Sequence, residues 1–265
     1  MNSPTRLYAH AGPGFWRSHA LWPLLLVLVA FAVIEGLGLD RSIAEALYFD
    51  RQNGHWLGSG GGDWWAHQLL HDDGRWLVRG IAAAAMFGWL ASFAVPAIRD
   101  WRQPAGFMAM AMVLSVALVG GLKAITNVDC PWDLAGFGGE LPHVALFADR
   151  PDYLPRAQCF PGAHASSGFA LVAGYFALRD RAPAWARAWL GAGLSLGCVF
   201  AIGQEARGAH FLSHDLAGAA LVWSVQLALY ATWLRRRSRA VRRARRTARE
   251  QGLDQEDGDD ALAAD

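Results

Sequence analysis

The sequence predicts an all-α fold, a polytopic membrane bundle of six transmembrane helices, on three observations. Hydrophobic residues make up 54% of the 265-residue chain and charged residues only 18%, against roughly 25% charged residues in soluble domains. Several apolar runs approach the roughly 20 residues that a helix needs to cross a bilayer. Tryptophans gather in the polar stretch between the first two runs, as in the aromatic belt at a membrane surface.

The apolar runs place the six spans at residues 20–39, 77–96, 107–125, 164–178, 188–206 and 211–234. Long polar loops, 40–76 and 126–163, follow the first and the third span. The second span is rich in Ala and Gly, which favours close packing of helices in membranes. We expect one transmembrane domain over residues 1–234, whose chemistry lies in 107–234, followed by a charged, disordered tail over 235–265.

Arginines gather in the short turns 97–103 and 179–187 and in the arginine-rich segment 235–249. Short basic segments stay on the cytoplasmic side of a membrane, and six spans put all three on that side. The sequence therefore predicts a protein of the inner (plasma) membrane with both termini in the cytoplasm and the polar loops facing the periplasm. The arginine-rich segment is typical of a stop signal that also attracts anionic lipid headgroups. We favour this interpretation over binding to nucleic acid.

The stretch from Arg207 to Asp215, between the last two spans, carries two imidazoles, a guanidinium and a carboxylate. Ionisable groups at the edge of a bilayer are costly to place and therefore mark functional sites. His210 and His214 are four residues apart, so on a helix they would share one face. The alternative is an interfacial loop whose histidines only face water.

Two further polar stretches lie at the same predicted depth, residues 123–133 at the end of the third span and residues 159–168 at the start of the fourth. A lysine, an arginine and several histidines around one point suit a phosphate, whose charge the cations and a helix N-terminus would balance. One histidine can then attack phosphorus while a second acts as general acid. Alternatively, Lys123 only extends to the lipid headgroups and His164 only caps its helix.

The order, spacing and membrane placement of these residues resemble the type 2 phosphatidic acid phosphatase (PAP2) superfamily, over residues 107–234. The motifs of that family are K-x6-R-P, P-S-G-H and S-R-x5-H-x3-D. Lys123 and Pro131 match the first motif, Pro161 and His164 the second, and His210 the third. The resemblance implies that His210 attacks phosphorus to form a phosphohistidine, that His164 protonates the leaving oxygen and that Lys123 binds phosphate oxygens. It implies no metal and no other cofactor.

The chain departs from these motifs at several positions. Cys130 stands where the first motif has Arg, the second motif reads Pro-Gly-Ala-His, and Gly203 and Gln204 stand at the Ser-Arg positions of the third. Arg207 lies about one helical turn beyond Gln204. Both residues are therefore candidates, with Lys123, for binding the substrate phosphate.

His214 stands at the position of the Asp in the third motif. As a neutral imidazole it could accept the ring N–H of His210 and fix the tautomer of that ring. It would not supply the negative charge that stabilises an imidazolium. Asp215 directly follows His214, so on a helix it would point away from the required direction, since a helix turns about 100° per residue. Glu205 and Asp129 are other candidate carboxylates, and the residues leave the choice open.

Cys130 and Cys159 both lie on the predicted outer side, where disulfides persist. A bond between them would tie together the ends of loop 126–163 and contribute roughly 3–4 kcal/mol in the chain-entropy model. The alternative is two free thiols. Cys198 lies inside the fifth span, where we expect a small packing residue.

These features favour a membrane phosphatase that hydrolyses a phosphomonoester or pyrophosphate of a membrane lipid or isoprenoid on the outer face. A phosphotransferase would use the same phosphohistidine, and a non-catalytic protein that binds a lipid phosphate would explain the altered motifs. A metal site made of His143, His164, His210 and His214 is a further alternative. It is disfavoured because the sequence has no tight ligand cluster such as H-E-x-x-H.

Overall fold

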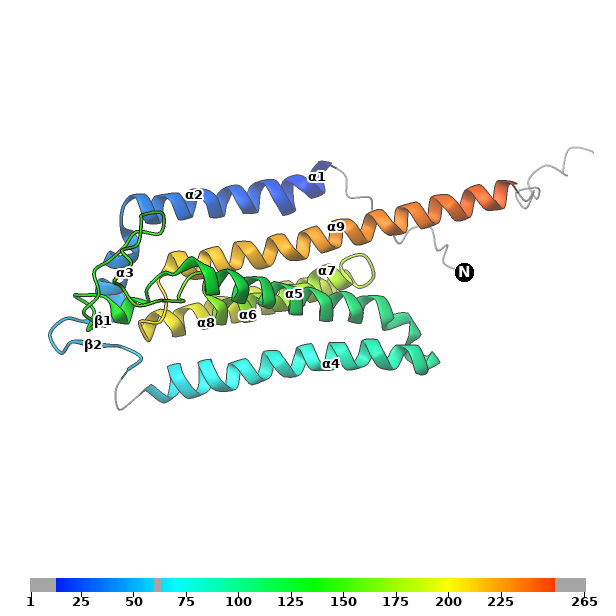
Figure 1. Ribbon diagram of the computed structural model, residues 1–265. Helices are drawn as coiled ribbons and strands as arrows, with labels where there is room; N and C mark the ends of the chain where they lie inside the picture. Colours follow the sequence, from blue (N-terminus) through cyan, green and yellow to red (C-terminus); the bar gives the residue numbers. More distant parts are fainter. Residues whose placement is uncertain (1–12, 60–62, 251–265) are drawn as a thin grey trace, which may run out of the picture. The chain divides into compact units, whose positions relative to one another are not determined.

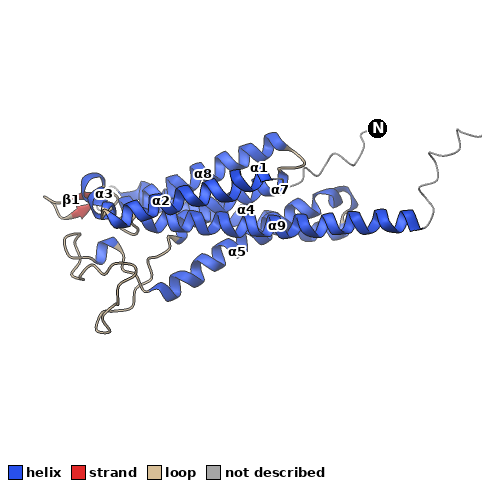
Figure 2. Cartoon of the chain, turned by 90° about the horizontal axis from the view of Figure 1, so that it is seen from above, coloured by secondary structure: helices blue, strands red, loops and turns tan. Residues whose placement is uncertain are grey.

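The computed structural model describes residues 13–59 and 63–250, which are predominantly helical (Figures 1 and 2). The elements of the first half are α1 (Pro13–Trp16), η2 (Arg17–Leu21), α2 (Trp22–Gly36), α3 (Leu39–Leu47), β1 (Phe49–Asp50), β2 (His55–Trp56), η3 (Asp63–Trp65), η4 (Ala66–Asp73) and α4 (Gly74–Ala94). The two short strands form an antiparallel hairpin in which Phe49 pairs with Trp56. η2 and η4 are π-helical segments that continue directly into α2 and α4.

The second half carries the residues that the motifs single out. Its elements are η5 (Pro96–Trp101), α5 (Arg102–Thr126), η6 (Pro131–Asp133), α6 (Ala163–Phe169), η7 (Ala170–Val172), α7 (Ala173–Leu178), α8 (Pro183–Ala206) and α9 (Leu212–Glu250). A long loop, residues 134–162, connects η6 to α6. Within residues 13–227, the long helices run side by side (Figures 1 and 2).

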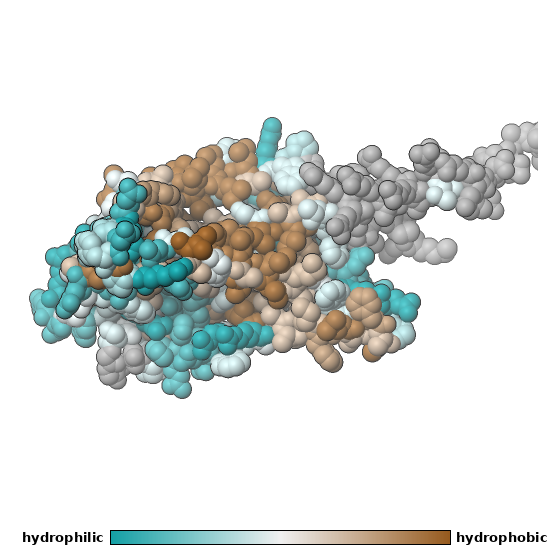
Figure 3. Space-filling view, in the orientation of Figure 1, coloured by the Kyte–Doolittle hydropathy of each residue, from teal (hydrophilic) through white to brown (hydrophobic). Residues whose placement is uncertain are grey.

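Among the described residues, five helical segments are long and apolar enough to cross a membrane: Pro13–Gly36, Ala66–Ala94, Pro96–Asp133, Pro183–Ala206 and Leu212–Trp233. On the face in Figure 3, apolar side chains cover the middle of the helices, and hydrophilic ones gather at the end with α3 and the hairpin. The all-α membrane fold predicted from composition and apolar runs is therefore confirmed.

The fourth predicted span differs from the other five, because it is only the shorter apolar helix Ala163–Leu178. At about 1.5 Å per residue it is shorter than the roughly 30 Å hydrocarbon layer. Twelve of its 16 residues are buried and none is exposed, and it packs against α5 and α8. A segment enclosed by other helices can be short, because its terminal backbone groups face protein rather than lipid.

Small residues bring this central segment close to its neighbours. A Cβ placed on Gly168 of α6 would lie 2.8 Å from the Cα of Gly197 in α8, so the two backbones are nearly in contact. On another side, the Gln226 amide of α9 donates to the Ala170 carbonyl at 3.0 Å. These contacts fix the depth and direction of α6, whose first turn carries His164.

The segment between α8 and α9 is held by the loops at the same end of the bundle. Gly208 has a φ of +72°, and a Cβ on it would lie 2.2 Å from the Trp56 ring. The Trp132 N–H donates to the Gly208 carbonyl at 2.9 Å. At the start of α9, the Ser213 N–H donates to the Asp40 carboxylate at 3.0 Å, which satisfies one of the open N–H groups of that helix end. Residues 207–211 are therefore fixed from both sides.

Several boundaries differ from the predicted ones. The predicted loop 40–76 is largely structured: it contains most of α3, the hairpin, and the helical segments that begin at Asp63. α8 begins at Pro183, five residues before the predicted span, with proline in the first turn, where its missing N–H costs nothing. α9 continues to Glu250, although a disordered tail was expected from residue 235. Residues 251–265 of that tail lie outside the described residues.

Candidate active site

A cavity of about 790 Å³ brings together most of the residues that the motifs single out. Its polar lining consists largely of cations, imidazoles and amides: Arg75, Arg79, Lys123, Arg207, His71, His164, His210, Gln158 and Gln204. Within the described part of the chain, no aspartate or glutamate lines it. A cavity with several cations and no carboxylate is electrostatically suited to an anion.

The rest of the cavity wall is apolar and comes from two neighbouring helices. α4 contributes Val78 and Ala82, and α5 contributes Met112, Val113, Val116 and Ala117. The cavity therefore has a cationic part and a hydrocarbon-like part, which matches an amphiphile with an anionic head.

His164 is held in the first turn of α6. The carbonyl of Leu70, in η4, lies 2.9 Å from its Nε2 and accepts the Nε2–H. The ring also stacks on Phe200 of α8, with 4.4 Å between the ring centroids. Because Nε2 is engaged with the backbone, Nδ1 is the ring nitrogen left to exchange a proton.

His210 lies just before α9 and is only 4% exposed. Burial lowers the pKa of its imidazole well below the ordinary value, and the nearby charge of Lys123 lowers it further. The ring is therefore neutral at physiological pH and keeps a lone pair, as a nucleophile requires. Its Nδ1 is buried and has no hydrogen-bond partner among the described residues.

His214 does not line this cavity. α9 begins only at Leu212, so His210 precedes the helix and the two histidines do not share a helix face. Their ring centroids are 5.8 Å apart in an edge-on arrangement. His214 instead lines a smaller cavity of about 110 Å³, together with His143 and Asp40. The predicted hydrogen bond from His210 to His214 is thus not formed.

The other candidate carboxylates are engaged elsewhere or isolated. Asp129 forms a two-fold ion pair with Arg150, with one N–O distance of 2.7 Å. Glu205 lies beside Tyr48, and burial together with that carboxylate raises the pKa of the Tyr48 hydroxyl to about 12. Both oxygens of Asp215 are buried and have no hydrogen-bond partner among the residues that the structure describes. No carboxylate in the described part of the chain is hydrogen-bonded to His210.

The four histidines considered as metal ligands are divided between the two cavities, with His164 and His210 in the larger one and His143 and His214 in the smaller one. No group of three or more His, Cys, Asp or Glu side chains in the described residues could hold a metal ion.

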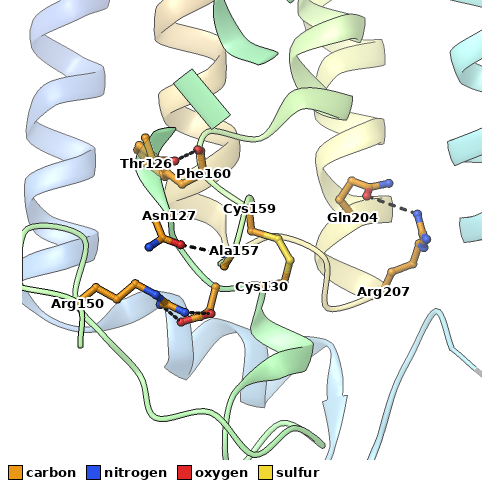
Figure 4. Close-up of a disulfide and its surroundings, with 10 residues drawn as sticks. Thr126, Asn127, Cys130, Arg150, Ala157, Cys159, Phe160, Gln204 and Arg207 are labelled. Carbon is orange, nitrogen blue, oxygen red and sulfur yellow. Dashed lines mark hydrogen bonds and ion pairs between the residues drawn. A yellow bond between two sulfur atoms is a disulfide. The ribbon is translucent and has the colours of Figure 1, made fainter. Parts of the chain in front are cut away.

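Gln204 lies between two other polar residues of the cavity. Its Oε1 accepts from the Arg207 guanidinium at 3.5 Å (Figure 4), and its Nε2 lies 3.2 Å from Nδ1 of His71. The structure thus brings Gln204 and Arg207 to the same cavity as Lys123, His164 and His210.

Three basic side chains of the cavity, His71, Arg75 and Arg79, were not among the predicted site residues, because they fall in the predicted loop 40–76 and at the start of the predicted second span. A signal was present in the sequence, since His67, His71, Arg75 and Arg79 follow one another at intervals of four residues. That spacing marks one face of a helix. The structure places this face on η4 and α4.

A family model described as the PAP2 superfamily matches residues 104–238, just over half of the chain. The chain belongs to the PAP2 superfamily. Neither the curated proteins nor the solved structures with which the chain was compared gave a significant match. Membership supports a phosphatase-type function in general and fits the helical membrane fold.

The departure from the second PAP2 motif has a steric reason. The backbone of Gly162 has φ −65° and ψ 109°, which any residue can adopt. A Cβ at this position, however, would lie 1.9 Å from Oδ1 of Asp215. The Asp215 carboxylate therefore fills the space that the Ser of the PAP2 motif would occupy.

The departure from the first PAP2 motif coincides with a covalent bond. Cys130, at the position of the motif Arg, forms a disulfide with Cys159, and we refer to this bond as the loop disulfide (Figure 4). Beside it, the Cys159 N–H donates to the Val128 carbonyl at 2.9 Å and the Ala157 N–H donates to Asn127 Oδ1 at 2.8 Å. Both sulfur-bearing residues line the cavity. The bond thus ties the end of α5 to the approach to α6.

Cys198 does not have the packing role predicted for it. It is a free thiol and is exposed on the surface of α8, so its side chain points out of the bundle. Hydropathy could not distinguish the two faces of this helix, since both are apolar.

Proposed function

We propose that the protein is a membrane phosphatase that hydrolyses a phosphomonoester or diphosphate of a lipid-type substrate, through a phosphohistidine on His210, on the outer face of the inner membrane. The single observation that carries the proposal is the cavity in which Lys123, His164, Arg207 and His210 meet without a carboxylate. PAP2 membership supports the class of reaction.

In the first step, a ring nitrogen of His210 forms a bond to phosphorus while the bond from phosphorus to the leaving oxygen breaks. That oxygen takes a proton from His164. Lys123 and Arg207 bind the non-bridging oxygens, where negative charge is concentrated in the transition state. In the second step, water attacks phosphorus and gives a proton to His164. The phosphorus–nitrogen bond then breaks, which releases inorganic phosphate and restores both histidines.

The apolar wall supports a lipid-type substrate. A polar phosphate ester would gain nothing from Val78, Met112 and Val116, whereas an alkyl or isoprenoid chain would bury apolar surface there, worth about 25 cal/mol per Å². The arginine distribution of the sequence supports an outward-facing site, because one predicted span separates each motif stretch from the nearest basic turn, 97–103 or 179–187, or from the arginine-rich segment.

A specific observation favours a second candidate, a protein that binds a lipid phosphate without cleaving it. No carboxylate in the described residues contacts Nδ1 of His210, so the group that usually stabilises a catalytic imidazole is missing. The loop disulfide also replaces an arginine of the PAP2 pattern.

Phosphate release decides between the candidates. The full-length chain, purified in detergent, is assayed in EDTA with phosphatidic acid and an isoprenoid diphosphate, beside His210→Ala and His164→Ala. His55→Ala, on the exposed hairpin outside the cavity, is the matched control. The proposal expects release in EDTA that is lost in both cavity variants and kept in the control. Binding without release would favour the binding protein, and release only with an added alcohol acceptor would indicate a phosphotransferase.

A further inference from the structure

η4 supplies two contacts to the proposed general acid from consecutive residues. The Leu70 carbonyl accepts from Nε2 of His164, and the ring of the next residue, His71, lies 4.6 Å from the His164 ring between centroids. His71 also lines the main cavity. A third imidazole therefore stands beside His164 and outside the part of the chain that matches the family model.

The hydrogen bonds around Gln204 determine where His71 carries its proton. The amide oxygen of Gln204 accepts from Arg207, so the amide nitrogen is the group that faces His71. An amide N–H can only donate, and Nδ1 of His71 must therefore be the acceptor. In the neutral ring the proton then lies on Nε2.

Nε2–H of His71 is available to a ligand. No hydrogen bond of this ring other than the one with Gln204 forms within the described part of the chain, and the residue is only partly buried. The neighbouring Asp72 does not compete for it, because its carboxylate faces Arg75 at 3.2 Å and His67 at 3.5 Å and does not line the cavity.

The two arginine positions of the PAP2 motifs also need a replacement. Cys130 is held in the loop disulfide and Gln204 is neutral, so neither donates a charged hydrogen bond to a phosphate. Gln204 instead holds one donor on each side of itself, Arg207 and His71, and both line the cavity.

We propose that His71 is a further phosphate-binding residue, which donates its Nε2–H to a phosphoryl oxygen of the substrate, and that Gln204 is a positioning residue that orients His71 and Arg207 together. The inference rests on the proposed function only in that the cavity takes a phosphate. It assigns part of the site to η4, far from the motifs in sequence, and explains why a glutamine can stand at an arginine position.

The test compares His71→Leu, His71→Gln and Gln204→Leu with wild type. Leucine removes both ring nitrogens, whereas glutamine keeps one acceptor and an N–H near the position of Nε2. His67→Leu is the matched control, one turn away, half-exposed and outside the cavity. The affinity for inorganic phosphate is measured by titration calorimetry on the full chain in detergent. kcat and KM are measured with phosphatidic acid, and thermal unfolding monitors folding.

We expect His71→Leu to weaken phosphate binding and to lower kcat/KM roughly 10- to 100-fold, the range for a lost hydrogen bond to a charged group. His71→Gln should recover most of the loss, Gln204→Leu should lie between, and His67→Leu should equal wild type. If His71→Leu fails to fold, the glutamine and Gln204 variants still carry the comparison.

Equal phosphate affinity in His71→Leu and His67→Leu would overturn the inference. If His71→Leu does not fold, a Gln204→Leu variant that binds phosphate as tightly as His71→Gln would overturn it. If wild type binds phosphate through His71 but releases none from lipids, the proposed function fails and the inference stands. If wild type turns substrate over and His71→Leu does so equally well, only the inference fails. A wild type that neither binds phosphate nor turns over would overturn both.

Discussion

The contact between Gly162 and Asp215 gives a prediction that links a motif departure to packing. Gly162→Ala adds a single carbon, and this carbon would lie 1.9 Å from Oδ1, 3.0 Å from Cγ and 3.2 Å from Cα of Asp215. The carboxylate has no obvious place to move, because Asp215 is only 2% exposed. The backbone at residue 162 is ordinary, so the cost of the substitution is one of space alone.

The magnitude follows from the contact distances. Adding a methyl group to a filled interior costs about 1–3 kcal/mol, and we expect Gly162→Ala to reach the upper part of that range. This corresponds to a decrease in Tm of roughly 2–4 °C per kcal/mol for a chain of this size. Asp215→Ala removes two buried oxygens that form no hydrogen bond within the described ranges of the chain, so alone it should cost little. The double variant should recover about 1–2 kcal/mol, since only the contact with the Asp215 Cα remains.

Thermal unfolding in detergent measures all four members of this cycle. Gly121→Ala is the matched control, because a Cβ there meets nothing within 4 Å. A Gly162→Ala variant as stable as the control would refute the steric argument. Destabilisation that Asp215→Ala fails to relieve would show that the strain arises elsewhere.

Three further predictions concern the ends of the long loop and the nucleophile. Arg150→Met should lower the free energy of unfolding by about 3–5 kcal/mol, because it leaves the Asp129 carboxylate (4% exposed) buried and unpaired. Arg51→Met removes an ion pair in which the Arg51 side chain is 65% exposed, so it should lower the free energy of unfolding by less than about 1 kcal/mol. Equal Tm values for the two variants would contradict this ranking. Reduction of the loop disulfide, which closes 29 residues, should lower stability by roughly 3–4 kcal/mol in the chain-entropy model, and an unchanged Tm after reduction would count against it. Since burial depresses the pKa of His210, this proposed nucleophile stays neutral at pH values below its ordinary pKa of 6.5, and the acid limb of kcat/KM should have its midpoint below pH 6.5. An acid limb centred above pH 6.5 would be inconsistent with the proposed role.

Much of the fold was predictable, because the length and apolarity of a run largely determine whether a helix can span a bilayer. The fourth span was already the shortest of the predicted six, but composition could not show that α5, α8 and α9 enclose it. The start of α8 at Pro183 was missed because Arg187, in its second turn, interrupts the apolar run.

In the candidate site, Lys123, His164 and His210 were predictable from the motif spacing and Arg207 from its place one turn beyond Gln204, and all four line one cavity. The contribution of η4 and the first turns of α4 was not predicted, because their periodic imidazoles and guanidinium groups lie in a stretch that also contains Gly and Asp. The position of His214 relative to His210 depends on where α9 begins. Because α9 begins at Leu212, His210 lies outside the helix, and the spacing of four residues no longer places both side chains on one helix face.

The central claim, that His210 forms a covalent bond to the phosphoryl group of the substrate, has one direct measurement. The reaction of the purified chain with phosphatidic acid is stopped in alkali within the first turnovers, since phosphohistidine survives base, and the digested chain is mapped by mass spectrometry. We predict phosphate on His210 of wild type, accumulating further in His164→Ala if the second step is slowed. Steady release of phosphate with no phosphate on His210, or equal release by His210→Ala, would contradict the account.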